Sequence, residues 1–173
     1  MLSGVANPVL TAAGLTAPVS YEGLAAAGSG LGSAGFIVYD DTRSMVGVAR
    51  MVSQFLYVES CGQCRACKNG CGEVTRRLDA IAERRGTTVD IQTIGERLRG
   101  VTDQNRCFLG EEEQRTVSSL LRSFPDEFVA ALEASGPAID TPLIPKLVDI
   151  VDGHAIYDER QRRKRPDWTY AAA

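Results

Sequence analysis

Three cysteines recur at intervals of three residues near the middle of the chain, at Cys61, Cys64 and Cys67. This spacing puts three thiols on one short loop, so the backbone there has to wrap around a compact metal–sulfur group. A fourth ligand must come from another part of the chain, and Cys107, between two predicted helices, is the candidate. The five cysteines are an odd number for disulfide pairing, and their clustering suits metal ligation in a reducing compartment. We therefore expect a metal site and a cytoplasmic location.

Two metal groups can be held by four thiolates. Structural zinc is common in such sites, but its ligands usually come as two separated pairs. A triplet with a spacing of three and three is the arrangement found around a [4Fe–4S] cube. The spacing therefore favours an iron–sulfur cluster at this site, and it leaves a structural four-cysteine zinc site as the alternative.

The residues next to the cysteines favour an anionic group. A cluster with four thiolates carries negative charge, and a helix expected to begin near Cys67 would offer it free N–H groups and the positive end of the helix dipole. Arg65, Lys68 and Arg106 add positive charge nearby. The local sequence is therefore consistent with a bound anionic cluster.

Hydrophobic periodicity predicts a small helical bundle in the middle of the chain. Apolar residues recur at helical spacing, and Gly and Pro mark where the segments stop. Asp41 or Thr42 can cap the first helix, and the acidic run 111–113 suits the positive end of a later one. The expected helices span residues 42–59, the cysteine loop to Gly86, 90–99 and 111–124, with a short further piece from Pro125 to about Gly136.

The fold class expected from these patterns is mainly α, in three parts. Residues 1–41 are rich in Gly, Ala and Pro and contain one predicted strand, Phe36–Tyr39, after a glycine-rich turn, which makes them a partial β segment. Residues 42–136 form the helical, cluster-binding domain. Residues 137–173 contain prolines and a basic run, so we expect an extended C-terminal arm there rather than a folded domain.

Composition excludes several functional classes. A net charge of -3 argues against bulk binding of nucleic acid. No uninterrupted apolar stretch approaches the length needed to cross a bilayer, so any membrane association would have to come through partners. The first twenty residues lack a basic segment and are interrupted by Pro8, Gly14 and Pro18, so we expect no signal peptide.

Three segments in the same order carry a resemblance to a known family. The stretch YVESCGQCRACKNG resembles the ESCGxCxPCRxG motif of the flavoprotein subunit of NADH:quinone oxidoreductase, which recurs in NAD-linked hydrogenases and formate dehydrogenases. SYEGLAAAGSGLGSAGFIVYDD upstream, and NRCFLG with VSSLLRSFPDEF downstream, resemble the family as well, so the likeness covers residues 18–128. Ala66 stands where the family usually has proline, and Lys68 where it usually has arginine.

The resemblance implies that this chain corresponds to the C-terminal iron–sulfur region of that flavoprotein and that it has a redox role. It implies one [4Fe–4S] cluster in a helical bundle that follows the end of a small ubiquitin-like β domain. The family's long N-terminal region, with its glycine-rich flavin and NADH site, is not in this sequence, so FMN and NAD(H) are expected on a partner chain. The ligands that it implies are Cys61, Cys64, Cys67 and Cys107.

The function expected on this basis is the relay of single electrons. The electrons would pass between a flavin-bearing, NADH-binding subunit and a further iron–sulfur protein, and the chain would have no catalytic residues of its own. A complete NADH oxidase in one chain is rejected, because the nucleotide-binding region is missing. A non-redox interaction module with structural zinc is the alternative from a different class.

Three other features have simpler interpretations. Cys71 lies one helical turn beyond the triplet and is expected to be a half-buried, packed thiol rather than a ligand. His154 is expected to be solvated or in a turn, with no chemical role. The basic run 160–165, followed by Trp168 and Tyr170, is either a solvated tail or a docking peptide for an acidic partner surface.

Overall fold

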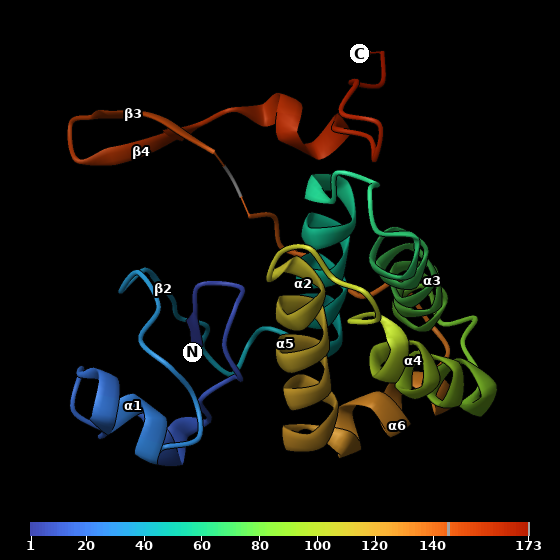
Figure 1. Ribbon diagram of the computed structural model, residues 1–173, viewed down its shortest axis with the longest axis horizontal. Helices are drawn as coiled ribbons and strands as arrows, with labels where there is room; N and C mark the ends of the chain where they lie inside the picture. The colour runs from blue at the N-terminus through green and yellow to red at the C-terminus, as the bar shows by residue number, and fades with distance from the viewer. Residues whose placement is uncertain (145, 173) are drawn as a thin grey trace.

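The computed structural model describes residues 1–144 and 146–172. A helical bundle forms its centre, the N-terminal segment lies on one side, and a C-terminal hairpin projects from it (Figure 1). The mainly helical class predicted from the sequence is confirmed. None of the described helices is both long and apolar enough to cross a membrane. The helices are α1 (Tyr21–Ala26), α2 (Met45–Glu59), α3 (Arg65–Ala82), α4 (Thr88–Gly100), α5 (Leu109–Ser123) and α6 (Pro125–Glu133), and the strands are β1 (Leu2–Ser3), β2 (Phe36–Ile37), β3 (Leu147–Val151) and β4 (His154–Tyr157).

The bundle is built around α2. This helix packs against α3 and α5, and α3 packs in turn against α4. The apolar residues that give each helix its periodicity meet in one core, where Val52, Leu78, Ile94 and Leu120 have no exposed surface. Burial of each such side chain contributes about 1.5–3 kcal/mol. The core therefore gives the loops at its ends a rigid frame.

The start of α2 differs from the prediction. The helix begins at Met45, and the hydroxyl of Ser44 caps it by accepting the N–H of Val46 at 3.3 Å. The prediction that Asp41 or Thr42 caps this helix was therefore wrong. The carboxylate of Glu127, from α6, accepts the first helical N–H at 2.7 Å. That partner is distant in the sequence, so local pattern reasoning could not place the boundary.

The N-terminal segment contains more structure than the single predicted strand. The strand is shorter than expected, at Phe36–Ile37, and it pairs antiparallel with β1. The prediction also missed the short helix α1, whose first turn is capped by the hydroxyl of Ser20. The segment is tied to α5, because the hydroxyl of Thr116 donates to a backbone carbonyl at 2.9 Å and that of Ser119 accepts an N–H at 2.8 Å.

The C-terminal arm is only partly extended. Its strands β3 and β4 form an antiparallel hairpin whose residues are all exposed. His154 is exposed as expected, but it lies in β4 and not in a turn. A short 3₁₀ helix, η2 (Glu159–Arg163), follows, and the chain then turns back toward the C-terminal end of α2 (Figure 1). The arm thus ends beside the cysteine loop.

Candidate iron–sulfur centre

The triplet loop, residues 60–64, joins two helices of the bundle. α2 ends at Glu59, and α3 begins at Arg65 with Cys64 as its N-cap residue. The first intrahelical bond of α3 runs from the N–H of Lys68 to the carbonyl of Cys64 at 3.0 Å, and no side chain caps the helix. Its first N–H groups and the positive end of its dipole therefore face the loop. The helix starts slightly earlier than the expected start near Cys67, so Cys67 lies in its first turn. The prediction that all three thiols lie on one loop was therefore wrong, because only Cys61 and Cys64 lie between the two helices.

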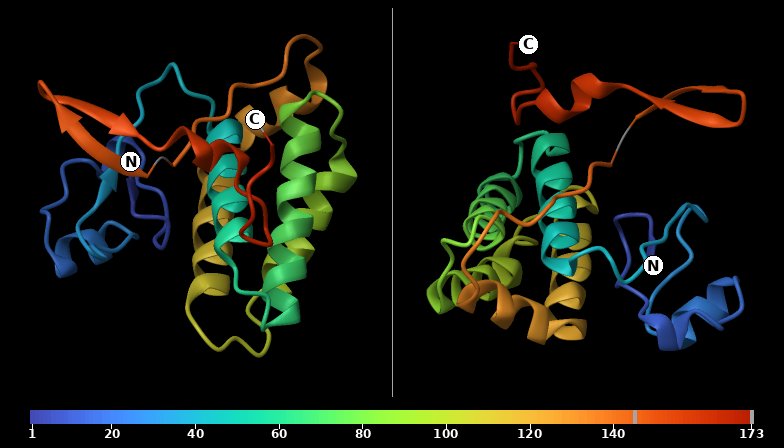
Figure 2. Two further views of the ribbon diagram at one scale, coloured as in Figure 1. Left: turned by 90° about the horizontal axis from the view of Figure 1, so that it is seen from above. Right: turned by 180° about the vertical axis from the view of Figure 1, so that it is seen from behind.

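The two loops that carry cysteines meet at one end of the bundle (Figure 2). Cys107 lies in the loop between α4 and α5. The guanidinium of Arg106 donates to Oε1 of Gln63 at 3.2 Å and so joins this loop to the triplet loop. The structure therefore brings the predicted fourth cysteine to the same end as the other three. The four thiols differ in exposure: Cys61 and Cys107 are exposed, Cys64 is half-buried and Cys67 is buried.

The candidate thiols are not gathered around one point in the described part of the chain. Within residues 1–144 and 146–172, no three His, Cys, Asp or Glu side chains lie close enough together to hold one metal ion. A structural zinc site needs four such donors around one ion. A cube takes one thiolate at each of four irons, so its ligands stand farther apart. A single ion and a cluster therefore require different separations of the same four thiols.

The surroundings of Cys67 favour its thiolate form. The thiol of Cys71 donates to the sulfur of Cys67, the hydroxyl of Ser60 lies 3.6 Å from that sulfur, and the ammonium of Lys68 is nearby. Together these three groups lower the pKa of Cys67 to about 6, although burial acts in the opposite direction. The same hydrogen bond and complete burial raise the pKa of Cys71. Cys71 is therefore a buried donor to a candidate ligand, and it is more deeply buried than the sequence led us to expect.

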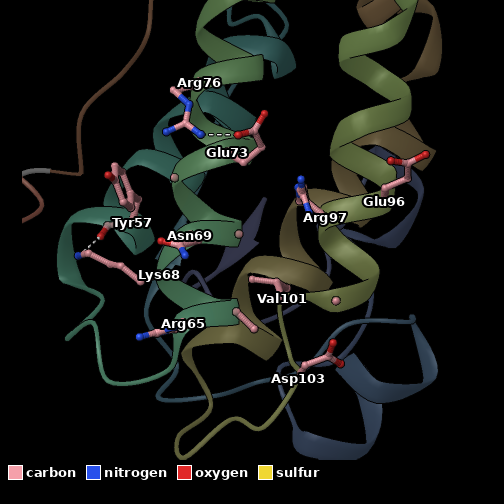
Figure 3. A pocket seen from close by; sticks show the side chains of 14 residues that line it. Tyr57, Arg65, Lys68, Asn69, Glu73, Arg76, Glu96, Arg97, Val101 and Asp103 are labelled. Carbon is pink, nitrogen blue, oxygen red and sulfur yellow. Dashed lines mark hydrogen bonds and ion pairs between the residues drawn. The ribbon is translucent and has the colours of Figure 1, made fainter.

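Lys68 joins the C-terminal end of α2 to the triplet loop. Its ammonium donates to the carbonyls of Tyr57 at 3.0 Å and Ser60 at 2.7 Å, and it lies 5.1 Å from the centre of the Tyr57 ring. Figure 3 shows Lys68 turned toward the Tyr57 carbonyl, at one side of a groove of about 530 Å³ lined by α3 and α4. The lysine therefore brings a positive charge to the thiols and fixes the loop that carries them.

Glu113 is a functional candidate that the sequence interpretation missed. The acidic run was expected to complement the dipole of α5, but Glu113 has no exposed surface. One carboxyl oxygen accepts the hydroxyl of Ser53 at 2.6 Å, and Ser53 lies 2.9 Å from the hydroxyl of Thr75. The other carboxyl oxygen has no hydrogen-bond partner among the residues that the structure describes. Burial raises the pKa of Glu113 to about 8. Its spacing from the buried Val117 and Leu120 was the available signal, since all three share one face of α5.

Comparison with known proteins agrees with this site. Residues 47–131 match the family described as the NADH-ubiquinone oxidoreductase-F iron-sulfur binding region. The chain belongs to this family. The matched range includes the triplet, Cys107 and the helices between them. The family resemblance predicted from the sequence is thereby confirmed, and so is the assignment to iron–sulfur, [4Fe–4S]-type electron-transfer proteins.

The relatives are much longer than this chain. The second F-type NADH-quinone oxidoreductase subunit of Rhizobium meliloti (strain 1021) is 35% identical over 130 residues, which are 75% of this chain and 31% of the relative. The F-type NADH-quinone oxidoreductase subunit of Mycobacterium tuberculosis (strain ATCC 25618 / H37Rv) is 35% identical over 141 residues, or 79% and 31%. The NADP-reducing hydrogenase subunit HndC of Solidesulfovibrio fructosivorans is 31% identical over 119 residues, or 69% and 24%. The chain thus spans less than a third of the length of these relatives.

Proposed function

We propose that this chain relays single electrons within an NAD-linked oxidoreductase through one [4Fe–4S] cluster. The ligands in this proposal are Cys61, Cys64, Cys67 and Cys107. The observation that carries it is the meeting of the two cysteine loops at the open N-terminus of α3, beside the Lys68 ammonium. A group of four thiolates and iron is anionic, so helix N–H groups and the Lys68 ammonium would stabilise it.

The role of the protein in such a relay is positioning and tuning. When bound, a [4Fe–4S] cluster accepts and donates one electron at a time. The bundle would fix its place, and hydrogen bonds, burial and charge around the thiols would set its potential. The exposure of Cys61 and Cys107 supports a location near the surface, where a partner's redox group can approach. None of the four cysteines is assigned an acid–base or nucleophilic role.

Partners complete the proposed reaction. The relatives are named as subunits of NADH-quinone oxidoreductases and of an NADP-reducing hydrogenase, which supports an assembly of several chains. We assign FMN and NAD(H) to a flavin-bearing partner, which would take a hydride and pass its electrons on singly. A further iron–sulfur protein would receive them. The chain would then stand between a two-electron donor and a one-electron acceptor.

Anaerobic purification followed by metal analysis tests this proposal. We expect a brown protein with about four irons per chain, bleached by dithionite and with an electron paramagnetic resonance signal after reduction. Cys107→Ser should lose the cluster or retain a three-iron form, because the triplet alone supplies three ligands. Cys71→Ser is the matched control and should keep the full iron content. A colourless wild-type protein with one zinc per chain would refute the redox assignment.

A further inference from the structure

The last residues of the chain form a compact turn, and we call residues 163–171 the strap. The N–H of Ala171 donates to the carbonyl of Arg163 at 2.9 Å, and that of Arg165 to the carbonyl of Thr169 at 2.8 Å. Trp168 lies at the tip with a φ of 67°, and its own N–H closes the turn on Arg165 at 2.8 Å. A tryptophan in the left-handed region is strained, so contacts elsewhere must hold this turn in place.

Three contacts fasten the strap beside the triplet loop. The indole N–H of Trp168 donates to the carbonyl of Val58 at 2.8 Å. The ammonium of Lys68 donates to the carbonyl of Pro166 at 2.7 Å. Lys164 forms an ion pair with Glu59 at 2.5 Å, and both side chains are more than half buried. All three anchors lie on the last turn of α2 or the first turn of α3, on either side of the cysteine triplet.

These contacts satisfy groups that a helix end leaves open. The last carbonyls of α2 have no partners within the helix, and an unpaired carbonyl at a partly buried site costs free energy. Trp168 supplies a donor to Val58, and Lys68 supplies donors to Tyr57 and Ser60. Lys68 therefore connects α2, the triplet loop and the strap through one ammonium group. The conformation of the loop next to Cys67 depends on residues about a hundred positions later in the chain.

The same contacts show that the basic C-terminal run is not wholly a solvated tail. A solvated tail would leave the indole N–H and the Lys164 ammonium to water, but both are bound to the end of α2. The strap is therefore part of the site's own architecture. Trp168 and Tyr170 nevertheless stay about half exposed, so a partner surface can still reach them.

We propose that the strap is a clamp on the triplet loop, with Lys68 and Trp168 as positioning residues that hold the loop in its cluster-binding form and slow cluster loss. This inference rests on the proposed function and goes beyond it, because it assigns a role to a segment outside the cysteine motif. The strap would act by joining the end of α2 to the start of α3, so that the loop between them opens less often.

The metal-free, reduced full-length chain provides the first test. Cysteine labelling with an alkylating reagent, read for each residue by mass spectrometry, reports how often the loop opens. Trp168→Phe keeps an aromatic ring but removes the N–H, so Cys67 should be labelled several-fold faster. Tyr170→Phe is the matched control, because it removes an exposed hydroxyl of the same strap whose hydrogen bond goes to Gln161 and not to the triplet loop. Cys107 lies on the other loop and should be labelled at the same rate in all variants.

The loaded protein provides the second test. Loss of the brown colour in the presence of an iron chelator should be several-fold faster in Trp168→Phe than in wild type or Tyr170→Phe. Lys68→Met should also shift the reduction potential downward, since it removes a positive charge near the thiols, whereas Lys68→Arg should restore it. A merely structural lysine would leave the potential unchanged. Equal rates of Cys67 labelling and of colour loss in wild type and Trp168→Phe would overturn the clamp.

The two proposals can fail separately. If wild type takes up zinc in place of iron, the electron-relay proposal fails, while the Cys67 labelling rates still decide whether the strap holds the loop. If Trp168→Phe does not fold by circular dichroism, Lys164→Met replaces it, since it breaks the ion pair with Glu59 and leaves the tryptophan in place. Faster Cys67 labelling in that variant supports the clamp, and unchanged labelling refutes it.

Discussion

Replacement of Glu113 by glutamine should change how the stability of this protein depends on pH. Burial raises the pKa of Glu113 from 4.5 to about 8, so between these values the folded protein holds a proton that the unfolded chain has released. The unfolded state binds fewer protons there, and the free energy of unfolding therefore falls as pH rises. Each pH unit costs about 1.4 kcal/mol, which amounts to about 5 kcal/mol over the whole interval. Above pH 8 this contribution becomes constant.

Urea denaturation of the metal-free, reduced protein at several pH values between 5 and 8.5 measures this effect. The glutamine in Glu113→Gln has no carboxyl proton to release on unfolding, so the stability of this variant relative to wild type should increase steadily with pH across that range. Cys67, whose pKa is lowered to about 6, contributes with the opposite sign, because above that pH the folded protein has lost a proton that the unfolded thiol keeps. Cys67 is present in both proteins, but its charge also interacts with Glu113. The difference between the two proteins therefore reports the carboxyl group together with that interaction.

A matched variant separates burial from simple loss of charge. Glu111→Gln removes a carboxylate from the same helix, but Glu111 lies near the surface beside Arg115. Its stability difference from wild type should vary by less than about 0.5 kcal/mol over the same pH range. A difference between wild type and Glu113→Gln that stays constant from pH 5 to 8.5 would refute the assignment of a raised pKa to Glu113.

Two further substitutions test the helices that position the site. Thr87 and Asp90 form a capping box at the start of α4, so Thr87→Ala should lower the free energy of unfolding by about 1 kcal/mol in urea denaturation; an unchanged midpoint would contradict that cap. A Cβ added at Gly47 would collide with the carbonyl oxygen of Asp140, so Gly47→Ala should destabilise the protein by about 1–3 kcal/mol. Gly95 on α4 faces open space and is the control, since Gly95→Ala should raise the free energy of unfolding by about 0.5–1 kcal/mol. A higher free energy of unfolding in both variants would exclude the collision at Gly47.

The sequence predicted those parts of the fold whose signals are local. The helices of the bundle were found because apolar residues repeat along each of them, and Pro125 does open α6 as its fixed φ suggests. The start of α2 was misplaced because Glu127 and Ser44 determine it together. The strand β1 was missed because two residues carry too little pattern, and its pairing with β2 closes a long loop. Long-range contacts decided each of these errors.

The candidate site also has parts that the local sequence predicted and parts that depend on long-range contacts. The spacing of the triplet predicted a metal site and favoured iron–sulfur over zinc, and the flanking motifs that resemble the family made the iron–sulfur assignment specific. What surrounds the thiols came from elsewhere: the Arg106 contact to Gln63, the buried carboxyl of Glu113 and the strap all join segments that are far apart in the chain. Glu113 was misjudged because a run of three acidic residues resembles a solvated helix start, although one of its members falls on the apolar face.

The matched family region and the complete site therefore do not coincide. Residues 47–131 contain every proposed ligand, but they lack Pro166, whose carbonyl accepts from Lys68, and Trp168, whose indole satisfies the end of α2. In the proposed function the four cysteines determine which group can be bound, because a [4Fe–4S] cluster takes one thiolate at each of its four irons. The clamp proposal assigns the holding of the loop to contacts that form only after the chain has returned to α2. Selection for cluster retention would thus act on the strap as well as on the cysteine motif.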